Sequence, residues 1–343
     1  MKLATLRDGT PDGTLNVVSR DLRWGLAVPT IARTLQEAID NWDSAAPLLE
    51  AVYEQLNTEN IADALCFAEQ VWESPLPRSW QWLDGSAFLS HSTLFRRIAG
   101  KTLPESYQQV PLMYQGGSDR FLGPGDPIPS RPQWGTDCEG EIAIVTACVA
   151  MGTDPIAAGD AVRLVMLAND VSLRELQGRE RDTGFGWIQS KPASAFSPVA
   201  VTPDELQGRW HDFKLHGELT VEINDEVLGR PNSGKDMAFN FGQLISHAAR
   251  TRNLCAGTII GSGTVSNYDV ATSGVACIAE KRLLEKLDGH TSFTPYLTPG
   301  DTVRIQMLDE FGHSIFGEIN QCVISAPKES EEIEAVLQGV SHA

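Results

Sequence analysis

The alternation of apolar and polar positions predicts short strands towards both ends of the chain. Near the start, residues 2–6 and 15–18 show the period of two that is typical of strands, and residues 8–14 between them are rich in Asp and Gly, as in a turn. Later strand-like runs occur at residues 219–223, 257–260, 301–307 and 314–319.

The helical period appears in five other stretches. They are residues 34–42, a stretch capped by Asp43 and Ser44 that runs to Leu56, residues 155–167 with Asp154 as cap and Pro155 in the first turn, residues 172–179, and residues 239–250.

The order of these elements predicts an α+β fold that is mostly β and mostly antiparallel, with peripheral helices, because strands and helices do not alternate as in a βαβ array. A chain of 343 residues is long for one compact core. A small N-terminal α+β domain is expected at residues 1–75, because the helical pattern ends in a polar segment before residue 61. A main domain at residues 76–330 and a C-terminal tail at residues 331–343 would follow.

An acidic strand is expected at residues 137–145. With a period of two, Asp137, Glu139 and Glu141 share one face, and the opposite face is apolar. These carboxylates repel one another on a half-buried strand, and a hard cation such as Mg²⁺, Mn²⁺ or Ca²⁺ would offset that cost. An edge strand with a solvated acidic face fits the same pattern, so this strand alone does not decide for a metal.

A second segment favours the metal site. An apolar run ends in Asn169 and Asp170, after which Ser172 can cap a new helix. Arg174 and Gln177 lie three positions apart and would share one face of that helix. A carboxylate beside a guanidinium and an amide suits an anion bound next to a metal, although a capped surface helix has the same appearance.

Two further segments carry weaker signals. Asp84 precedes His91 across a turn rich in Gly and Ser. The glycines of residues 257–267 suggest a phosphate loop, but the segment lacks the lysine and the helix that such a loop requires. These glycines would let the backbone pass close to a ligand, with Thr264 as a hydroxyl donor, or they form a plain β-turn.

Charge and composition narrow the class of partner. The chain has 27 basic and 45 acidic residues, a net charge of −18, and such a surface repels nucleic acid. We interpret most of the acidity as a solvated surface. No apolar run approaches the roughly 20 residues of a membrane span, and the start lacks a signal sequence, so no membrane association and a cytoplasmic location are expected. The six cysteines form no C-x-x-C pair, which argues against a zinc ribbon.

In their order along the chain, these segments resemble the fumarylacetoacetate hydrolase family, and the match covers almost the whole sequence. The matching positions are Asp84 and His91 with the family's spacing of seven, Tyr114, the pair Glu139 and Glu141, the segment from Asn169 to Gln177, Lys191 with Pro192, Gly263-Thr264-Val265-Ser266, and Glu280.

The resemblance implies a mixed β-roll catalytic domain and a role for each matching residue. The implied ligands of one Mg²⁺ or Ca²⁺ ion, with Mn²⁺ also possible, are Asp84, Glu139, Glu141 and Asp170. The implied catalytic residues are His91, Glu280, Arg174, Gln177 and Lys191. The implied substrate contacts are Tyr114, Thr264 and Ser86. Two departures, Ser86 in place of a tyrosine and Asn267 in place of a glycine, leave the substrate open.

The resemblance also implies an activity. It is hydrolysis of a C–C bond in a 1,3-diketo acid such as fumarylacetoacetate or an acylpyruvate, as in tyrosine and aromatic amino acid degradation, with His91 and Glu280 activating water. A homodimer is implied as well. Two alternatives remain: a metal-dependent keto-acid decarboxylase or hydratase of the same family, and a non-enzymatic protein with a structural Ca²⁺ site.

Overall fold

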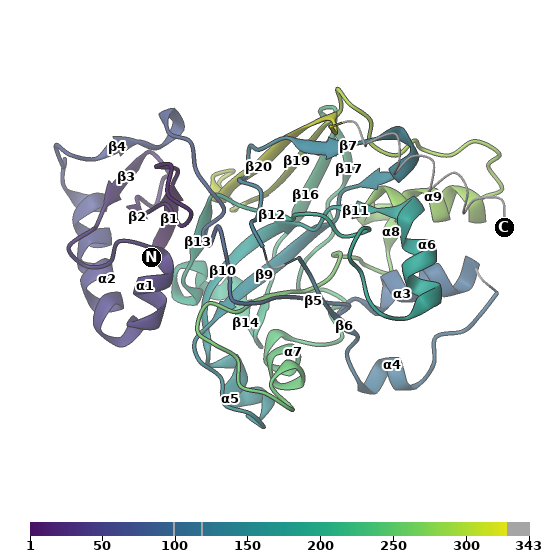
Figure 1. Ribbon diagram of the computed structural model, residues 1–343, viewed down its shortest axis with the longest axis horizontal. Coiled ribbons are helices and arrows are strands. Elements are labelled where there is room, and N and C mark those ends of the chain that lie inside the picture. The colour runs from purple at the N-terminus through teal and green to yellow at the C-terminus, as the bar shows by residue number, and fades with distance from the viewer. Residues whose placement is uncertain (99, 118, 328–343) are drawn as a thin grey trace.

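The computed structural model describes residues 1–98, 100–117 and 119–327 and has a mixed α/β fold built on two large sheets (Figure 1). The expected tail at residues 331–343 lies outside the described residues. Within the described part of the chain, no helix is both long and apolar enough to cross a membrane.

The larger sheet has eleven strands and contains the strands that carry the candidate site. Its pairings are antiparallel except that of β18 with β5. Across the sheet the order is β4 (Leu65–Cys66), β3 (Trp24–Ala27), β2 (Thr14–Val18), β1 (Lys2–Leu6), β13 (Val199–Val201), β10 (Val162–Asn169), β9 (Gly140–Thr146), β18 (Ile259–Gly261), β5 (Trp82–Gly85) and β6 (Met113–Gln115), with β12 (Ala195–Phe196) paired to β10.

The second large sheet has five strands, in the order β17 (Glu226–Gly229), β16 (Leu219–Ile223), β19 (Thr302–Leu308), β20 (Ser314–Ser325) and β7 (Ile128–Ser130). Two short ladders join β11 (Ser172–Leu173) to β8 (Thr136–Asp137) and β14 (Trp210–His211) to β15 (Lys214–Leu215). The prediction of a mostly antiparallel β fold is confirmed, because only β20 with β7 and β18 with β5 pair in parallel within the described strands.

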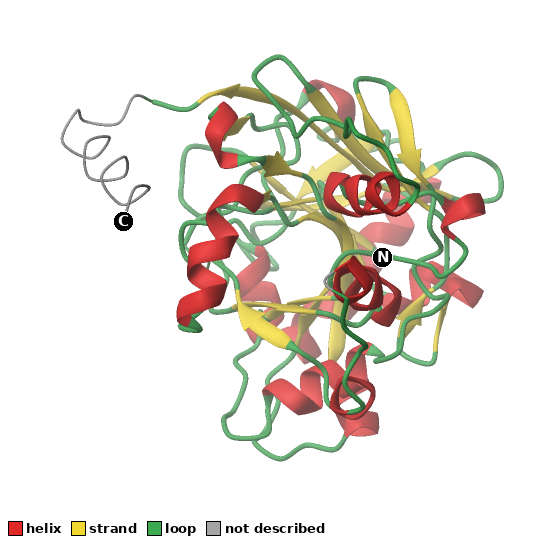
Figure 2. Ribbon diagram, turned by 90° about the vertical axis from the view of Figure 1, so that its right-hand side faces the viewer, coloured by secondary structure: helices red, strands yellow, loops and turns green. Residues whose placement is uncertain are grey.

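The helices lie around the sheets (Figure 2). They are α1 (Leu35–Asp40), α2 (Trp42–Thr58), α3 (Leu89–Ile98), α4 (Ser106–Gln109), α5 (Pro155–Gly159), α6 (Arg174–Thr183), α7 (Phe241–Ala248), α8 (Val270–Ser273) and α9 (Ile278–Leu287). Short 3₁₀ turns occur at Phe67–Glu69, Pro132–Trp134 and Pro203–Arg209.

Strand β9 is buried on both faces. Ile142 and Ile144 pack in the core between the two large sheets. Ala143 and Val145 point the other way and pack in the cluster that contains Leu49 of α2. The sequence predicts this alternation correctly, but it predicts a half-buried strand. The carboxylates at the start of β9 are therefore more deeply buried than the pattern indicates.

The N-terminal strands continue the larger sheet. Strand β1 pairs with β13 in a register that places Lys2 opposite Val201. Helices α1 and α2 cover this end of the sheet (Figure 1). Helix α2 begins at Trp42 and its N-cap is Asn41, so the predicted cap at Asp43 and Ser44 is wrong. A division of the chain near residue 75 stays a prediction.

The helix predicted over residues 155–167 is wrong beyond its first turns. Asp154 does cap α5, and its Oδ1 accepts the N–H groups of Ile156 at 2.9 Å and Ala157 at 3.2 Å. The helix ends at Gly159, and the following residues form β10. Because β10 is buried on both faces, its apolar residues are continuous and do not show the strand period.

The predicted cap at Ser172 is also wrong. Ser172 belongs to β11, and its buried hydroxyl has no hydrogen-bond partner among the described residues. Helix α6 begins two residues later, at Arg174. The predicted acidic strand is likewise interrupted, because β8 ends at Asp137 and β9 begins at Gly140.

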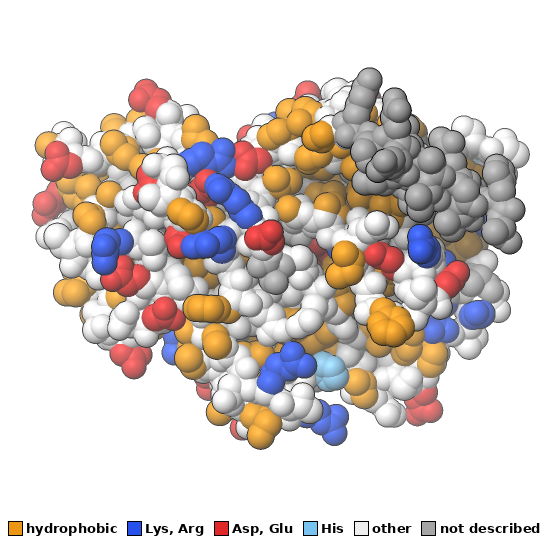
Figure 3. Space-filling view, viewed as in Figure 1, with side chains coloured by type: hydrophobic (Ala, Val, Ile, Leu, Met, Phe, Trp, Pro, Cys, Tyr) orange, Lys and Arg blue, Asp and Glu red, His pale blue; other side chains and the backbone are white. Residues whose placement is uncertain are grey.

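Charged side chains of both signs are interspersed on the one face of the molecule that Figure 3 shows. On the face drawn in Figure 3, acidic and basic side chains alternate with apolar and neutral ones. This distribution agrees with the interpretation of most of the net charge as a solvated surface.

Pairing of β1 with β13 predicts cooperative unfolding of the N-terminal strands with the rest of the chain. Leu3 is fully buried in β1, so Leu3→Ala should cost about 2–5 kcal/mol and lower the Tm of one single transition. Leu48→Ala, at a residue 54% exposed on α2, is the matched control and should change the Tm little. Calorimetry that resolves a separate transition for the N-terminal region would contradict this expectation.

Candidate active site

Three carboxylates meet where the central strands of the larger sheet end. Asp84 lies in β5, Glu141 in β9, and Asp170 directly after β10. Each offers an oxygen that lies within 4.8 Å of the others, and all three side chains are buried. The sheet register brings them together, because β18 pairs with both β5 and β9 and places Gly261 opposite Asp84.

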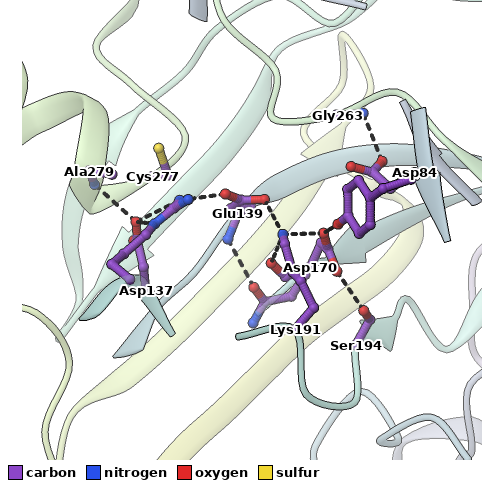
Figure 4. A network of polar contacts seen from close by, with 12 residues as sticks. Asp84, Asp137, Glu139, Asp170, Lys191, Ser194, Gly263, Cys277 and Ala279 are labelled. Carbon is purple, nitrogen blue, oxygen red and sulfur yellow. Dashed lines mark hydrogen bonds and ion pairs between the residues drawn. The ribbon is translucent and has the colours of Figure 1, made fainter. Parts of the chain in front are cut away.

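Gly261 leaves the space that two of these carboxylates occupy. A Cβ at this position would lie 2.4 Å from Oδ1 of Asp84 and 3.0 Å from Oε2 of Glu141. Asp84 is also fixed by backbone, since its Oδ1 accepts the N–H of Gly263 at 3.0 Å (Figure 4). The glycine-rich segment thus brings backbone close to the carboxylates, as the sequence predicts.

A lysine connects Asp170 to Glu139. Lys191 is buried, and its Nζ donates to Oε2 of Glu139 at 2.8 Å and to Oδ2 of Asp170 at 2.5 Å (Figure 4). Tyr114 donates its hydroxyl to the same Asp170 oxygen, and Ser194 donates to Oδ1 at 2.7 Å. Glu139 is not among the three carboxylates within 4.8 Å of one another, and it forms ion pairs with Lys191 and Arg174 instead.

The environment divides the carboxylates into two electrostatic classes. Burial, and then the charge of Asp170, raises the pKa of Asp84 to about 7. Burial and the charge of Asp84 raise the pKa of Glu141 well above its usual range. Burial also opposes ionisation of Glu139, but Arg174 and Lys191 outweigh it and hold the pKa of this carboxyl well below its usual range. Positive charge is therefore paired with Glu139, whereas Asp84 and Glu141 form no ion pair among the described residues.

This donor set fits a hard divalent cation. Both carboxylate oxygens of Glu141 are buried and have no hydrogen-bond partner among the described residues. Burying a carboxylate without a partner costs folding free energy, and the two side chains grouped with Glu141 are further carboxylates that repel it. Oxygen donors of this kind are those that Mg²⁺, Ca²⁺ and Mn²⁺ bind. Asp84, Glu141 and Asp170 would hold the ion, with Glu139 beside them.

A histidine–glutamate pair lies on two helices of the same region. Nδ1 of His91, on α3, lies 2.8 Å from Oε1 of Glu280, on α9. Glu280 is buried, whereas the His91 side chain is 19% exposed. A carboxylate can only accept at this contact, so Nδ1 carries the proton and Nε2 is free to accept one. The Cys277 thiol lies within 4.8 Å of both residues.

The Asp137 side chain forms no hydrogen bond with Asp84, Glu141 and Asp170 or with His91 in the described part of the chain. Its Oδ1 accepts the N–H of Ile278 at 2.7 Å, and its Oδ2 accepts the N–H of Ala279 at 2.9 Å and Nε of Arg174 at 2.8 Å (Figure 4). Arg174 also forms an ion pair with Glu139. Sequence reasoning places Asp137 on the metal-facing side of the strand, whereas the structure directs it to α9.

The remaining predicted residues have few polar contacts. Gln177 is half-buried on α6, and its side chain has no hydrogen-bond partner among the described residues. Thr264 is buried beside Gly263. Ser86 is half-buried, and its hydroxyl lies 3.2 Å from that of Ser92. Their assigned roles in binding or catalysis stay predictions.

Two protein-family models match successive parts of the chain. Residues 81–324 match the C-terminal fumarylacetoacetate hydrolase domain, and residues 1–78 match the fumarylacetoacetase N-terminal domain 2. The chain belongs to the fumarylacetoacetate hydrolase family. The resemblance recognised in the sequence is thereby confirmed.

Two oxaloacetate tautomerases are similar in sequence to about half of this chain. A mitochondrial oxaloacetate tautomerase of Oryza sativa subsp. japonica is 32% identical over 186 residues, which cover 52% of this chain and 76% of that protein. A second mitochondrial oxaloacetate tautomerase of the same plant is 29% identical over 170 residues, covering 48% of this chain and 71% of that protein.

Solved structures of the fumarylacetoacetate hydrolase family share the fold over nearly the whole chain. A putative HpcE protein from Mycobacterium smegmatis has a TM-score of 0.67 at 20% identity and covers 95% of this chain and 100% of its own. The maleylpyruvate hydrolase of Sphingobium sp. SYK-6, solved with manganese(II) and pyruvate, has a TM-score of 0.64 at 17% identity with the same coverage. At these identities the likeness concerns the fold.

The raised pKa of Asp84 predicts a pH-dependent response to metal. The folded pKa of about 7 exceeds that of the unfolded chain, so the folded state binds the proton more tightly. In metal-free protein, the stabilisation that comes from this tighter proton binding is fully present below about pH 4 and is lost as the pH rises to about 7. Because Mg²⁺ replaces the proton, the rise in Tm on adding Mg²⁺ to EDTA-treated protein should grow as the pH rises through about 7. Thermal unfolding that shows the same rise at every pH would contradict the site.

The close approach at Gly261 gives a second prediction. Gly261→Ala would place a methyl group against Asp84 and Glu141, so it should weaken Mg²⁺ affinity by about 10–100-fold. Gly208→Ala is the matched control, because a Cβ there meets no atom within 4 Å. Isothermal titration with Mg²⁺ measures both, and equal affinities in the two variants would exclude the assigned geometry.

Proposed function

We propose that this protein is a metal-dependent hydrolase that cleaves a C–C bond in a 1,3-diketo acid, such as an acylpyruvate or fumarylacetoacetate. The observation that carries the proposal is the contact of 2.8 Å between His91 and the buried Glu280, and a backbone bridge between Cys277 and Glu139 connects this pair to the region of the buried carboxylates. Hydrolysis requires an activated water, and a histidine oriented by a carboxylate is a common way to provide it.

His91 acts as the general base in this proposal. Glu280 accepts from Nδ1–H and so fixes the tautomer in which Nε2 takes a proton from water. When the proton has been transferred, the buried carboxylate stabilises the imidazolium. The 19% exposure of the His91 side chain leaves it open to water, while its partner is shielded.

The carboxylates and the basic residues provide electrostatic stabilisation. A divalent ion held by Asp84, Glu141 and Asp170 would polarise the carbonyl oxygens of the substrate as a Lewis acid. Lys191 is buried and the Arg174 side chain is 9% exposed, and each already forms an ion pair with a carboxylate. Fixed positive charges of this kind stabilise negative charge that develops near them in the transition state.

The proposed reaction balances with water as the only second reactant. The water oxygen adds to the carbonyl carbon, and the bond from that carbon to the methylene carbon breaks. The electron pair stays on the leaving enolate, which takes a proton from the imidazolium of His91. An acylpyruvate thus gives a carboxylic acid and pyruvate, and fumarylacetoacetate gives fumarate and acetoacetate.

A second candidate is a tautomerase or lyase acting on a keto acid, which includes the decarboxylase and hydratase alternatives. The observation that favours it is the name of the two relatives at 32% and 29% identity, which are oxaloacetate tautomerases. The same histidine could move a proton between carbon and oxygen without adding water.

A substrate panel with Mg²⁺ present separates the candidates. Loss of the enol absorbance of an acylpyruvate or of fumarylacetoacetate, with two products, supports the hydrolase. Release of CO₂ from oxaloacetate, or a faster exchange between its keto and enol forms, supports the second candidate. Stabilisation by Ca²⁺ without turnover of any panel member would support a structural ion site instead.

The role of His91 gives a mutational prediction. His91→Ala should lower kcat by about 10²- to 10⁴-fold, because the general base is lost, while the rise in Tm on adding Mg²⁺ should be unchanged. His290→Ala, at an exposed histidine that follows α9, is the control and should retain wild-type kcat. Full hydrolysis by His91→Ala would refute the assignment of the base.

A further inference from the structure

Asp137 is a buried carboxylate whose polar contacts all lie on two elements that carry other site residues. It is fully buried, and its oxygens accept from two backbone N–H groups of α9 and from the guanidinium of Arg174 on α6. It is outside the group formed by Asp84, Glu141 and Asp170. Its contacts therefore call for a role other than metal ligation.

On one side, Asp137 binds the start of α9. The first two N–H groups of this helix, from Ile278 and Ala279, donate to its two oxygens at 2.7 and 2.9 Å. The third, from Glu280, points to the Cys277 thiol at 3.4 Å. The N–H groups of a helix start have no partners within the helix, so side chains fix its position here. Glu280 is in this first turn and holds His91.

On the other side, Asp137 holds Arg174. Nε and Nη2 of the guanidinium both lie 2.8 Å from Oδ2, and Nη2 also binds Glu139. A planar guanidinium bound along one edge in this way has a fixed orientation. Asp137 thus joins Arg174 and Glu139, beside the carboxylate group, to the helix that carries the acid–base pair.

We propose that Asp137 is a positioning residue that sets the place of the His91–Glu280 pair relative to Arg174 and Glu139. It acts through α9 and Arg174 and does not touch substrate or ion. The proposal rests on the hydrolase or lyase function of this site for its kinetic consequences, but not for its structural one.

Both oxygens of Asp137 are needed, which makes the amide a sharp test. Asn has nearly the same shape, but its amide group must turn an N–H₂ towards the N–H of Ile278 or towards the N–H of Ala279 and Arg174. Turned towards Ile278, it loses one of the two contacts with α9; turned the other way, it loses the other contact with α9 and both contacts with Arg174. Asp137→Asn should lower kcat by about 10–100-fold and leave KM and Mg²⁺ affinity within about twofold of wild type.

The matched control is a carboxylate with the same kind of partners elsewhere. Oδ2 of Asp126 accepts the N–H of Gly123 at 2.7 Å and Nη2 of Arg7 at 2.6 Å, and neither partner is a candidate site residue. Asp126→Asn should lower the Tm without changing kcat. If both variants lose only stability, Asp137 has a purely structural role and the proposal is overturned.

A double-mutant cycle shows whether Asp137 acts through Glu280. In the background Glu280→Gln, the further effect of Asp137→Asn on kcat should fall to within about twofold. A full additional loss of about 10–100-fold in that background would show that the two residues act independently and would overturn the proposal.

One readout does not depend on turnover. The proton on Nδ1 of His91, bound to Glu280, should give a downfield imidazole resonance that is identified by its loss in His91→Ala. Asp137→Asn should shift or broaden this resonance, and Asp126→Asn should not. An unchanged resonance in Asp137→Asn overturns the positioning role. Failure of wild-type protein to turn over any panel substrate overturns the proposed function and leaves this test intact.

A second pair of variants carries the test if Asp137→Asn does not fold. Ile278→Pro removes one N–H donor to Asp137 at the first helical position, where proline is tolerated. Ile278→Ala loses the same apolar contacts and keeps the N–H. The proline variant should show the lower kcat, by about 10-fold, and the shifted resonance. Equal kcat and equal spectra in the two variants would overturn the proposal.

Discussion

Repulsion among buried carboxylates is the constraint on which the site depends. Asp84, Glu141 and Asp170 converge where strands of the central sheet end, and no basic side chain pairs with the first two in the described part of the chain. Burial strengthens their repulsion and raises the pKa of Asp84 and Glu141. Such a group is tolerable in a stable fold when a proton or a cation neutralises it. The need for a proton or a cation at this place thus follows from the position of the strands.

The basic residues of the site pair with carboxylates other than Asp84 and Glu141. Lys191 and Arg174 neutralise Glu139 and lower its pKa, and Lys191 also pairs with Asp170. Their charge is therefore already engaged before any ligand arrives, and their positions are fixed by the acids around them. Charges held in place stabilise a transition state without any rearrangement of the site. The ion pairs of Lys191 and Arg174 thus favour the proposed chemistry.

Side-chain chemistry in the sequence predicts much of this site, but not the contacts made by backbone. The order of Asp84, Glu139, Glu141 and Asp170 indicates a metal site, and the strand at residues 219–223 has the predicted bounds. The continuous apolar run of β10 is misread as helix because a strand buried on both faces has no period. The partners of Asp137 are N–H groups 141 and 142 residues away, which no pattern of side chains reveals.

The parallel pairing of β5 with β18 bears on the order of folding. It joins segments around residues 84 and 261, and the carboxylates converge only when this long-range ladder and the pairing of β9 with β10 have both formed. Closing so long a loop is a slow and late event. An ion bound by these carboxylates would not nucleate the fold, because the carboxylates are far apart in the unfolded chain. It would capture only molecules in which the central sheet is already complete, and so binding would select correctly assembled chains.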